Sequence, residues 1–217
     1  MATGKGSGTG AVSHLERLAA DPEGHHVLQA LRIIEASFPD NPRLGESLRP
    51  RLDVVRLGQE AVLAFPSSTI ASFRNPQDGL PVRLSNRFFG LFGPNGPLPL
   101  HMTEYARDRR RNHRDHTMIA FVDMITHRMM GLFYRAWAAS QPTASHDRGD
   151  DRLARQVSAL SGYHADNLQG RDDLPDDARL FYAGYYSQGS RSPEGLMAIV
   201  RSFFSVHVEL EAIVGYW

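Results

Sequence analysis

The sequence has 217 residues but no cysteine and a single lysine, Lys5, and both shortages limit what the protein can do. Without cysteine there is no disulfide, no thiolate nucleophile and no zinc–thiolate site. This absence fits a reducing compartment, so we expect a cytoplasmic protein. Because nearly all the positive charge is arginine, the cationic groups suit bidentate pairing with carboxylates, as at protein interfaces.

The sequence also lacks a long apolar run and an excess of charge of either sign. No 18-residue apolar run exists, and the N-terminal MATGKGSGTGAVSHL has no apolar centre typical of a signal peptide. Lys+Arg is 24 and Asp+Glu is 24, whereas proteins that wrap nucleic acid are usually basic. The composition therefore predicts no direct membrane insertion and disfavours nucleic acid as a partner.

Apolar periodicity predicts an α+β fold that is mainly helical. Helical spacing of apolar residues predicts helices over 25–38, 103–113, 117–139, 151–163 and 175–187, and one more that begins at 192. Short β-branched segments between turn-prone links predict two to four strands near 50–85. A further strand is expected near 205–211, where apolar residues alternate, and we expect the sheet to be small and antiparallel.

The composition along the chain also suggests a domain division. The Gly/Ser-rich start predicts a disordered N-terminal arm over 1–24, followed by one α+β domain over 25–217. The chain stops just after the strand expected near 205–211, so we expect this domain to be cut short at its C-terminal end.

The stretch RFFGLFGPNGPLPLH places Gly90, Gly93 and Gly96 at a regular spacing of three. This spacing does not match the glycine loops that bind phosphate, and the prolines remove N–H groups that a phosphate would need. We instead expect a turn with Gly96 in the left-handed conformation, followed by a proline-stiffened arm. Such a rigid loop could dock on its own domain or on a partner. Its candidate interface residues are Phe92, Pro94, Asn95, Pro97, Leu98 and Pro99.

A cluster of arginines follows this loop. A solvated helix face, an acidic protein partner and a nucleic acid would each account for it, but Tyr105 is the only aromatic residue close by. We favour an acidic protein surface, with an arginine-rich nucleic-acid-binding module as the alternative. The candidate interface residues are Arg107, Arg109, Arg110 and Arg111.

Helix 117–139 is apolar on nearly every face, which is typical of a helix that is buried centrally or lies against a second protein. Phe133 and Trp137 are its candidate interface residues. Asp123 and His127 stand four residues apart, and we expect Asp123 to orient His127 or to pair with Arg128.

Patterns for catalysis and metal binding are incomplete. No serine lies in a G-x-S-x-G elbow that could join Asp123 and His127, and there is no H-E-x-x-H string. His113 and His116 could bind a metal with His101, His127 or Asp123 as a third ligand, but a helix boundary is expected between them. We therefore predict no catalytic residue, no metal and no cofactor.

Several stretches resemble a known family. FFGLFGPNGPLPLHMTEYARDRRRNHRD and FYRAWAASQPTASHDR are similar to the TssG family, also called ImpH or VasB, and the similarity extends from about residue 25 to the end of the chain. Members of this family are subunits of the baseplate of the bacterial type VI secretion system and are usually longer than this chain.

The resemblance implies a non-enzymatic organiser of the baseplate wedge. It implies binding to TssF, engagement of TssK with TssE nearby, and assembly around the VgrG hub, on which the sheath polymerises. It also implies a position at the secretion apparatus docked on the inner membrane. We expect charge reversal at Arg109, Arg110 and Arg111 to weaken wedge assembly while leaving the melting of the isolated chain largely unchanged.

Overall fold

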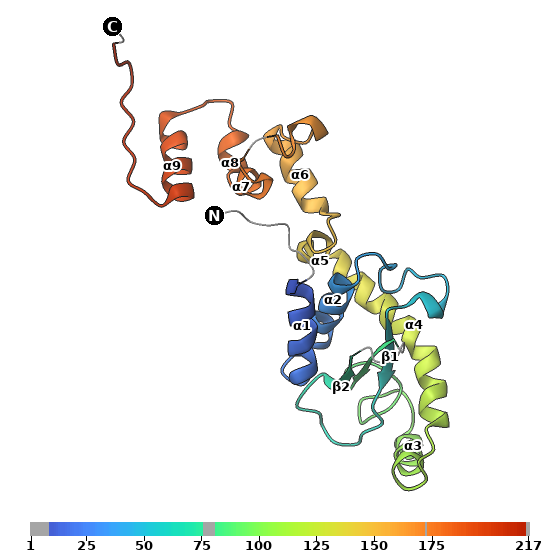
Figure 1. Ribbon diagram of the computed structural model, residues 1–217. Coiled ribbons are helices and arrows are strands. Elements are labelled where there is room, and N and C mark those ends of the chain that lie inside the picture. The colour runs from blue at the N-terminus through green and yellow to red at the C-terminus, as the bar shows by residue number, and fades with distance from the viewer. Residues whose placement is uncertain (1–8, 76–80, 172, 216–217) are drawn as a thin grey trace. The chain divides into compact units, whose positions relative to one another are not determined.

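The computed structural model describes residues 9–75, 81–171 and 173–215, and the chain divides into two compact units, 1–148 and 149–217 (Figure 1). The composition along the chain predicted one domain over 25–217. The elements of the first unit are α1 (Thr9–Ala20), α2 (Val27–Ser37), the short 3-10 helix η1 (Pro50–Leu52), β1 (Val55–Gln59), β2 (Ile70–Arg74), β3 (Val82–Asn86), α3 (Leu100–Asn112), α4 (Thr117–Ala139) and α5 (Pro142–His146). Those of the second are α6 (Arg152–Ser161), η2 (Asp166–Leu168), α7 (Asp176–Phe181), α8 (Ala183–Tyr186) and α9 (Pro193–Phe204).

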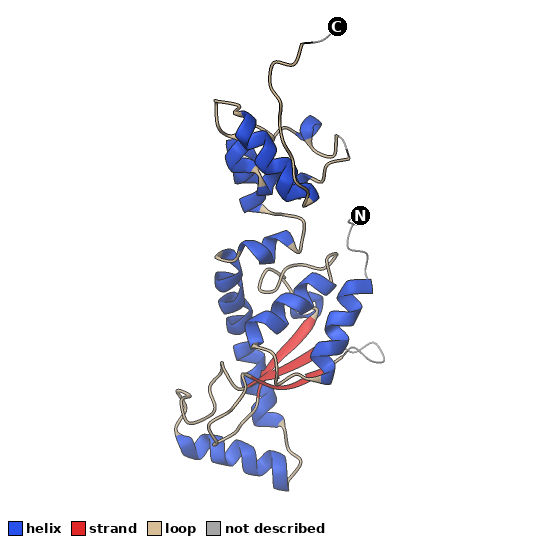
Figure 2. Cartoon of the chain, turned by 90° about the vertical axis from the view of Figure 1, so that its left-hand side faces the viewer, coloured by secondary structure: helices blue, strands red, loops and turns tan. Residues whose placement is uncertain are grey.

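The fold is α+β and mainly helical, as predicted, with one three-stranded sheet among the described residues (Figure 2). The strand order is β1-β3-β2, with β1 parallel to β3 and β2 antiparallel to it. The prediction of an antiparallel sheet is therefore wrong for one of the two pairs. The chain reverses twice between β1 and β3, and β3 inserts beside β1, so these two strands run the same way.

The strand expected near 205–211 is not present. No helix or strand is assigned to residues 206–211, and the described residues offer them no neighbouring strand. Alternation of apolar residues predicts which side chains share a face, whereas a strand also requires a second strand to accept and donate its hydrogen bonds.

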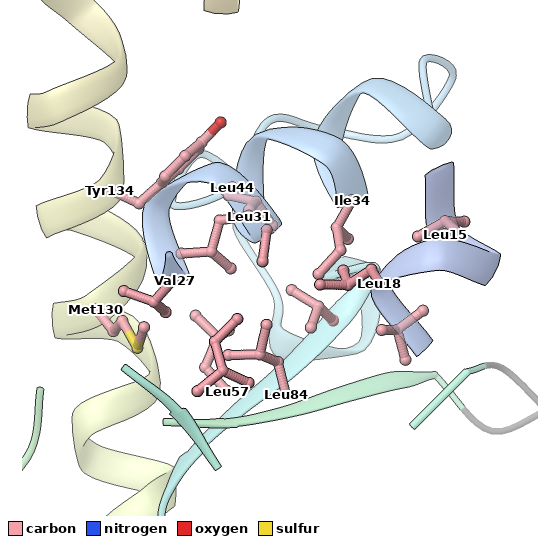
Figure 3. Close-up of a cluster of buried hydrophobic side chains, with 14 residues drawn as sticks. Leu15, Leu18, Val27, Leu31, Ile34, Leu44, Leu57, Leu84, Met130 and Tyr134 are labelled. Atoms are coloured by element: carbon pink, nitrogen blue, oxygen red, sulfur yellow. The ribbon is translucent and has the colours of Figure 1, made fainter. Parts of the chain in front are cut away.

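The core of the first unit lies between the sheet, α2 and α4 (Figure 3). Val27, Leu31 and Ile34 of α2 pack with Leu84 of β3 and Met130 of α4. Helical spacing on α2 and strand alternation on β3 bring these side chains to a common centre.

Helix α1 also belongs to this core, although the Gly/Ser-rich composition predicted a disordered arm over 1–24. Leu18 is fully buried and Leu15 nearly so, both against the sheet and α2. The prediction rested on the Gly/Ser-rich composition of the first residues and overlooked the helical spacing of Leu15 and Leu18. Residues 1–8 lie outside the described residues.

A buried carboxylate connects three segments of the first unit. Glu35 of α2 accepts a hydrogen bond from the Leu44 N–H at 2.9 Å and another from the Tyr134 hydroxyl of α4 at 2.9 Å. Burial raises the pKa of Tyr134 well above its usual range, and the neighbouring Glu35 raises it further. Tyr134 therefore stays protonated and serves as a hydrogen-bond donor.

The second unit has a much smaller core. Among the described residues of this unit, Tyr182 is the one buried hydrophobic side chain. Nearby in the sequence, the Arg179 guanidinium lies 5.7 Å from the centre of the Tyr163 ring. The helix expected over 175–187 is interrupted at Tyr182, giving α7 and α8. Ser192 caps α9 as its sequence predicts, with its hydroxyl accepting from the Gly195 N–H at 3.1 Å.

Candidate interaction site

The loop at 90–99 folds onto its own unit. Phe92 is only 2% exposed and packs with Ala106 of α3 and with Ile119 and Val122 of α4. Gln59 fixes the backbone of Phe92 from both sides: the Phe92 N–H donates to Oε1 at 2.8 Å, and Nε2 donates to the Phe92 carbonyl at 2.7 Å. Phe92 is thus a core residue and is not displayed to a partner, which settles one of the two possibilities for this side chain.

Gly90 and Gly93 have a positive φ in this loop, and Gly96 does not. The φ angle of Gly93 is +105°, and its N–H donates to Thr103 Oγ1 at 3.1 Å. Gly96 is needed for a different reason, because a Cβ at this position would lie 2.5 Å from the Leu91 carbonyl oxygen. The sequence predicted a helix over 103–113, but α3 begins at Leu100. Thr103 therefore lies inside the helix and is not its N-cap.

The outer surface of the loop is formed by its prolines. Leu98 is partly buried against Phe92 and its neighbours, and its N–H donates to the Leu91 carbonyl at 3.2 Å. The residues that remain exposed are Pro94, Asn95, Pro97 and Pro99. The turn therefore presents a rigid, largely apolar edge whose backbone is already fixed.

The arginines of α3 fall into two groups. Arg109 donates to Asp115 Oδ2 through Nε at 3.0 Å and Nη2 at 2.7 Å, and Arg110 donates to Glu60 Oε1 at 3.0 Å. Hydrogen bonds from the Thr117 hydroxyl and N–H, with a further one from Arg109, hold the pKa of Asp115 well below its usual range. These two arginines fasten α3 to neighbouring segments of the same chain.

Arg107 and Arg111 form the second group. They stand one helical turn apart, are exposed, and make no ion pair with any described residue. With Leu63, Glu104, Asp108 and Asn112 they line a shallow hollow of about 420 Å³. Because Arg109 and Arg110 pair with carboxylates of their own chain, reversing Arg109, Arg110 and Arg111 together is also expected to lower the melting temperature.

Helix α4 has a buried face and an exposed apolar face. Val122, Thr126 and Met130 face the interior, and α4 packs along β1. On the other side lie exposed apolar side chains at helical spacing, which we call the outer stripe: Phe121, Met124, Ile125, Met129 and Leu132, between 41% and 68% exposed. A contiguous apolar surface of this kind is typical of an interaction site.

The two α4 residues singled out from the sequence differ in exposure. Phe133 is exposed at one edge of the helix and stacks on Phe89, with ring centres 5.6 Å apart. Trp137 packs against the core and lies 5.8 Å from the ring of Tyr134. The outer stripe was missed as a set, although the spacing of 121, 125, 129 and 132 becomes visible once the core positions 119, 122, 126 and 130 are set aside.

The Asp123–His127 pair expected from the sequence does not form. Asp123 accepts from the Gln59 N–H at 2.8 Å and from Arg83 Nη2 at 3.3 Å. Burial raises the pKa of Asp123, against the lowering effect of these donors. The side chain therefore joins α4 to the sheet.

His127 instead contacts Asp53, with His127 Nε2 2.9 Å from Asp53 Oδ2, while its Nδ1 accepts from the Leu57 N–H at 3.2 Å. Ser47 donates its hydroxyl to the same carboxylate, so the aspartate lies between serine and histidine. This order differs from a nucleophilic triad, in which histidine must contact the serine hydroxyl to take its proton. Arg128 donates to the Ser47 carbonyl at 2.9 Å and does not pair with Asp123.

The described part of the chain holds neither a cluster of metal-binding side chains nor a membrane-spanning helix. Among those residues no three His, Asp or Glu side chains are grouped so that they could hold a metal ion, and His101, His113 and His116 do not converge. Nor is any helix there both long and apolar enough to cross a membrane.

The family model described as "Type VI secretion, TssG" matches residues 21–217. The chain belongs to the TssG family. It is thus a baseplate component of type VI secretion, and the glycine–proline turn, the arginine helix and the outer stripe of α4 all lie within the matched region. No curated protein and no solved structure matches the chain.

Membership of the TssG family gives these surfaces a context. TssG is a structural family of the baseplate, and subunits of such an assembly contact other proteins. In this TssG-family chain the exposed prolines, Arg107 and Arg111, and the outer stripe are separate surfaces, on a loop and on two helices.

Proposed function

We propose that this protein is a structural subunit of the baseplate wedge that binds TssF through the outer stripe of α4. It helps to recruit TssK, lies near TssE, and organises the wedge around the VgrG hub so that the sheath can assemble. It performs these roles in the cytoplasm, at the secretion apparatus docked on the inner membrane, and without catalysis or a cofactor.

The exposed apolar face of α4 carries this proposal. Met124 is 68% exposed and Phe121 is 58% exposed, although both lie on a 23-residue helix whose other face is in the core. Leaving large apolar side chains in water is unfavourable by about 25 cal/mol for each Å². A subunit that works inside an assembly removes this cost when the partner covers the stripe.

Two other surfaces support contacts with more than one partner. The exposed prolines at 94, 97 and 99 form a preorganised edge that loses little entropy on docking. Arg107 and Arg111 make no ion pair with a described residue, so their guanidinium groups are available to the carboxylates of a partner. Separate surfaces of different chemistry suit a subunit that joins several proteins, and we assign the stripe to TssF and the other two to the remaining partners.

The test is co-expression with TssF, followed by affinity capture and measurement of the mass of the complex. In the variant Ile125→Glu/Leu132→Glu, two charges replace the centre of the stripe. We expect at least roughly a tenfold loss of captured TssF, because removing central apolar anchors typically costs more than about 1 kcal/mol each.

The matched control is Leu160→Glu, which places the same charge at a 78% exposed leucine of α6. It should capture TssF like the parent chain. Undiminished capture by the folded double variant would remove the stripe from the interface. The alternative, an arginine-rich nucleic-acid-binding module, would be favoured only if the chain shifted labelled duplex at low salt, where phosphate binding is strongest.

A further inference from the structure

Part of the connection between α2 and β1 lies along α4 (Figure 1). We call residues 43–53 the strap. Gly45 makes its closest approach: a Cβ at this position would lie 2.7 Å from the Gly131 carbonyl oxygen and 3.2 Å from the Leu132 nitrogen. Leu132 belongs to the outer stripe, so the strap borders the surface that the proposed function assigns to TssF.

Both ends of the strap are fixed to α4. The Ser47 carbonyl accepts a hydrogen bond from Arg128 at 2.9 Å, and at the other end Asp53 Oδ2 lies 2.9 Å from His127 Nε2. The Ser47 hydroxyl also donates to the Asp53 carboxylate, which closes the strap into a loop. Residues 48–52, which we call the tip, are therefore held from both sides.

The backbone of the tip is fixed as well. The Leu52 N–H donates to the Arg49 carbonyl at 2.9 Å, which forms the turn of η1. The Pro50 carbonyl accepts from the Asp53 N–H at 3.2 Å and also from the guanidinium of Arg56 in β1. A partner therefore meets a preorganised surface, and little backbone entropy is lost when it binds.

The tip exposes apolar and cationic side chains together. Leu48 is 94% exposed, and Leu52, Arg49 and Arg51 are exposed beside it. A single exposed leucine is ordinary on a protein surface. Here, however, two leucines and two arginines stand on consecutive exposed residues of a fixed loop that borders an apolar stripe. Arginine is enriched at protein interfaces, so this composition favours a binding surface.

The charge of the tip indicates the chemistry of its partner. Both acidic residues of the strap are already paired, Glu46 with Arg135 at 3.1 Å and Asp53 as described above. Arg49 and Arg51 make no ion pair with a described residue. Guanidinium groups pair best with carboxylates, so the surface that covers the tip is expected to carry Asp or Glu. A single-stranded nucleic acid would require aromatic side chains for stacking, and the tip has none.

We propose that the tip is a second contact for the subunit that covers the outer stripe. Leu48 inserts into an apolar pocket of TssF, and Arg49 and Arg51 pair with Asp or Glu side chains at the rim of that pocket. This inference rests on the proposed function, because it requires TssF to cover the stripe. A buried apolar centre excludes water from the surrounding ion pairs, which strengthens them.

Capture of co-expressed TssF by the full chain tests the apolar contact. Leu48→Ala should reduce the captured TssF roughly tenfold, as expected when one central apolar side chain is removed from an interface. Phe65→Ala is the matched control, because Phe65 is 82% exposed on another loop of the same unit, and it should capture TssF like the parent chain. Both variants should melt like the parent, since neither side chain is in the core.

Charge variants test the acidic rim. Arg49→Glu/Arg51→Glu should reduce capture by at least as much as Leu48→Ala, whereas Arg49→Lys/Arg51→Lys, which keeps the charge, should lose less. Arg107→Glu/Arg111→Glu reverses two exposed arginines of α3 and is the control, because the proposed function assigns them to other partners. Added salt should weaken the capture by the parent chain more than that by Arg49→Glu/Arg51→Glu, since salt screens the ion pairs at the rim.

The possible results separate this inference from the proposed function. Full capture by both tip variants, with capture lost in Ile125→Glu/Leu132→Glu, overturns the inference alone. An equal loss in Arg107→Glu/Arg111→Glu also overturns it, because the charge then acts without local pairing. Binding of the parent chain to phosphatidylserine vesicles that is lost in Leu48→Ala would assign the tip to a lipid surface instead. Full capture by Ile125→Glu/Leu132→Glu overturns the proposed function and the inference with it.

Discussion

Gly96 shows how a single side chain decides the shape of the loop at 90–99. The Gly96 N–H donates to the Gly93 carbonyl at 3.1 Å, and the backbone passes directly over the carbonyl groups of Leu91 and Phe92. The sequence predicted that glycine is needed at position 96 for a left-handed backbone, but in the structure it is needed because a side chain would not fit. Both reasons give the same residue, and only the packed loop distinguishes them.

We expect Gly96→Ala to destabilise the first unit by about 2 kcal/mol, because the new Cβ would lie 2.5 Å from one carbonyl oxygen and 2.7 Å from another. Gly184→Ala is the control, since its Cβ would have no atom within 4 Å and alanine favours the helical backbone of α8. Urea denaturation of both variants checks this, and equal stabilities would show that the turn relaxes without cost.

At the scale of elements, α3 is held to the sheet by a bridging carboxylate. Glu60, which follows β1, accepts from Arg110 of α3 at 3.0 Å and from Arg87 at 2.8 Å. Burial acts to raise the pKa of Glu60, but the hydrogen bonds from Arg110 and Arg87 outweigh it and lower the pKa. The arginines of α3 thus differ in role: Arg110 attaches the helix to Glu60, whereas Arg107 and Arg111 are exposed to solvent.

Arg110→Ala should lower the free energy of unfolding by about 1 kcal/mol at pH 7, a typical value for a partly buried charged hydrogen bond. Because the folded-state pKa of Glu60 is lowered, this stability is present above the ordinary pKa of 4.5 and is lost as the pH falls through the folded-state value. The difference between variant and parent should therefore shrink on acidification.

Arg111→Ala provides the comparison, since Arg111 pairs with no described residue and its removal should change stability by less than about 0.5 kcal/mol. Denaturation curves at pH 7 and pH 3.5 measure both effects. A loss for Arg111→Ala as large as that for Arg110→Ala would contradict the division of the arginines into two groups.

At the scale of the whole molecule, the two units differ in the size of their hydrophobic cores. Most buried hydrophobic residues belong to residues 1–148, whereas Tyr182 is the one among the described residues of 149–217. Burial of apolar surface is the main source of stability. The second unit therefore depends on smaller contributions, such as the Arg179–Tyr163 contact, and on whatever binds to it.

We expect two unfolding transitions, with 149–217 unfolding at the lower temperature. Tyr182→Ala should lower the temperature of the first transition and leave that of the second unchanged. Leu84→Ala, at a fully buried site of β3, should lower the free energy of unfolding in the second transition by about 3 kcal/mol. Differential scanning calorimetry distinguishes the two. A single transition shifted by both variants would show that the units unfold together.

The sequence by itself determined the local features of this protein: the main helices, the cap at Ser192, the short strands and the family. These depend on spacing and on neighbouring residues, which a sequence contains in full. Tertiary structure decided the direction of β3, the burial of Phe92, the internal pairing of Arg109 and Arg110, and the face of α4 that stays uncovered. A helix that is apolar on two sides has no local property that selects which side is packed, because the choice belongs to the segments that fold against it.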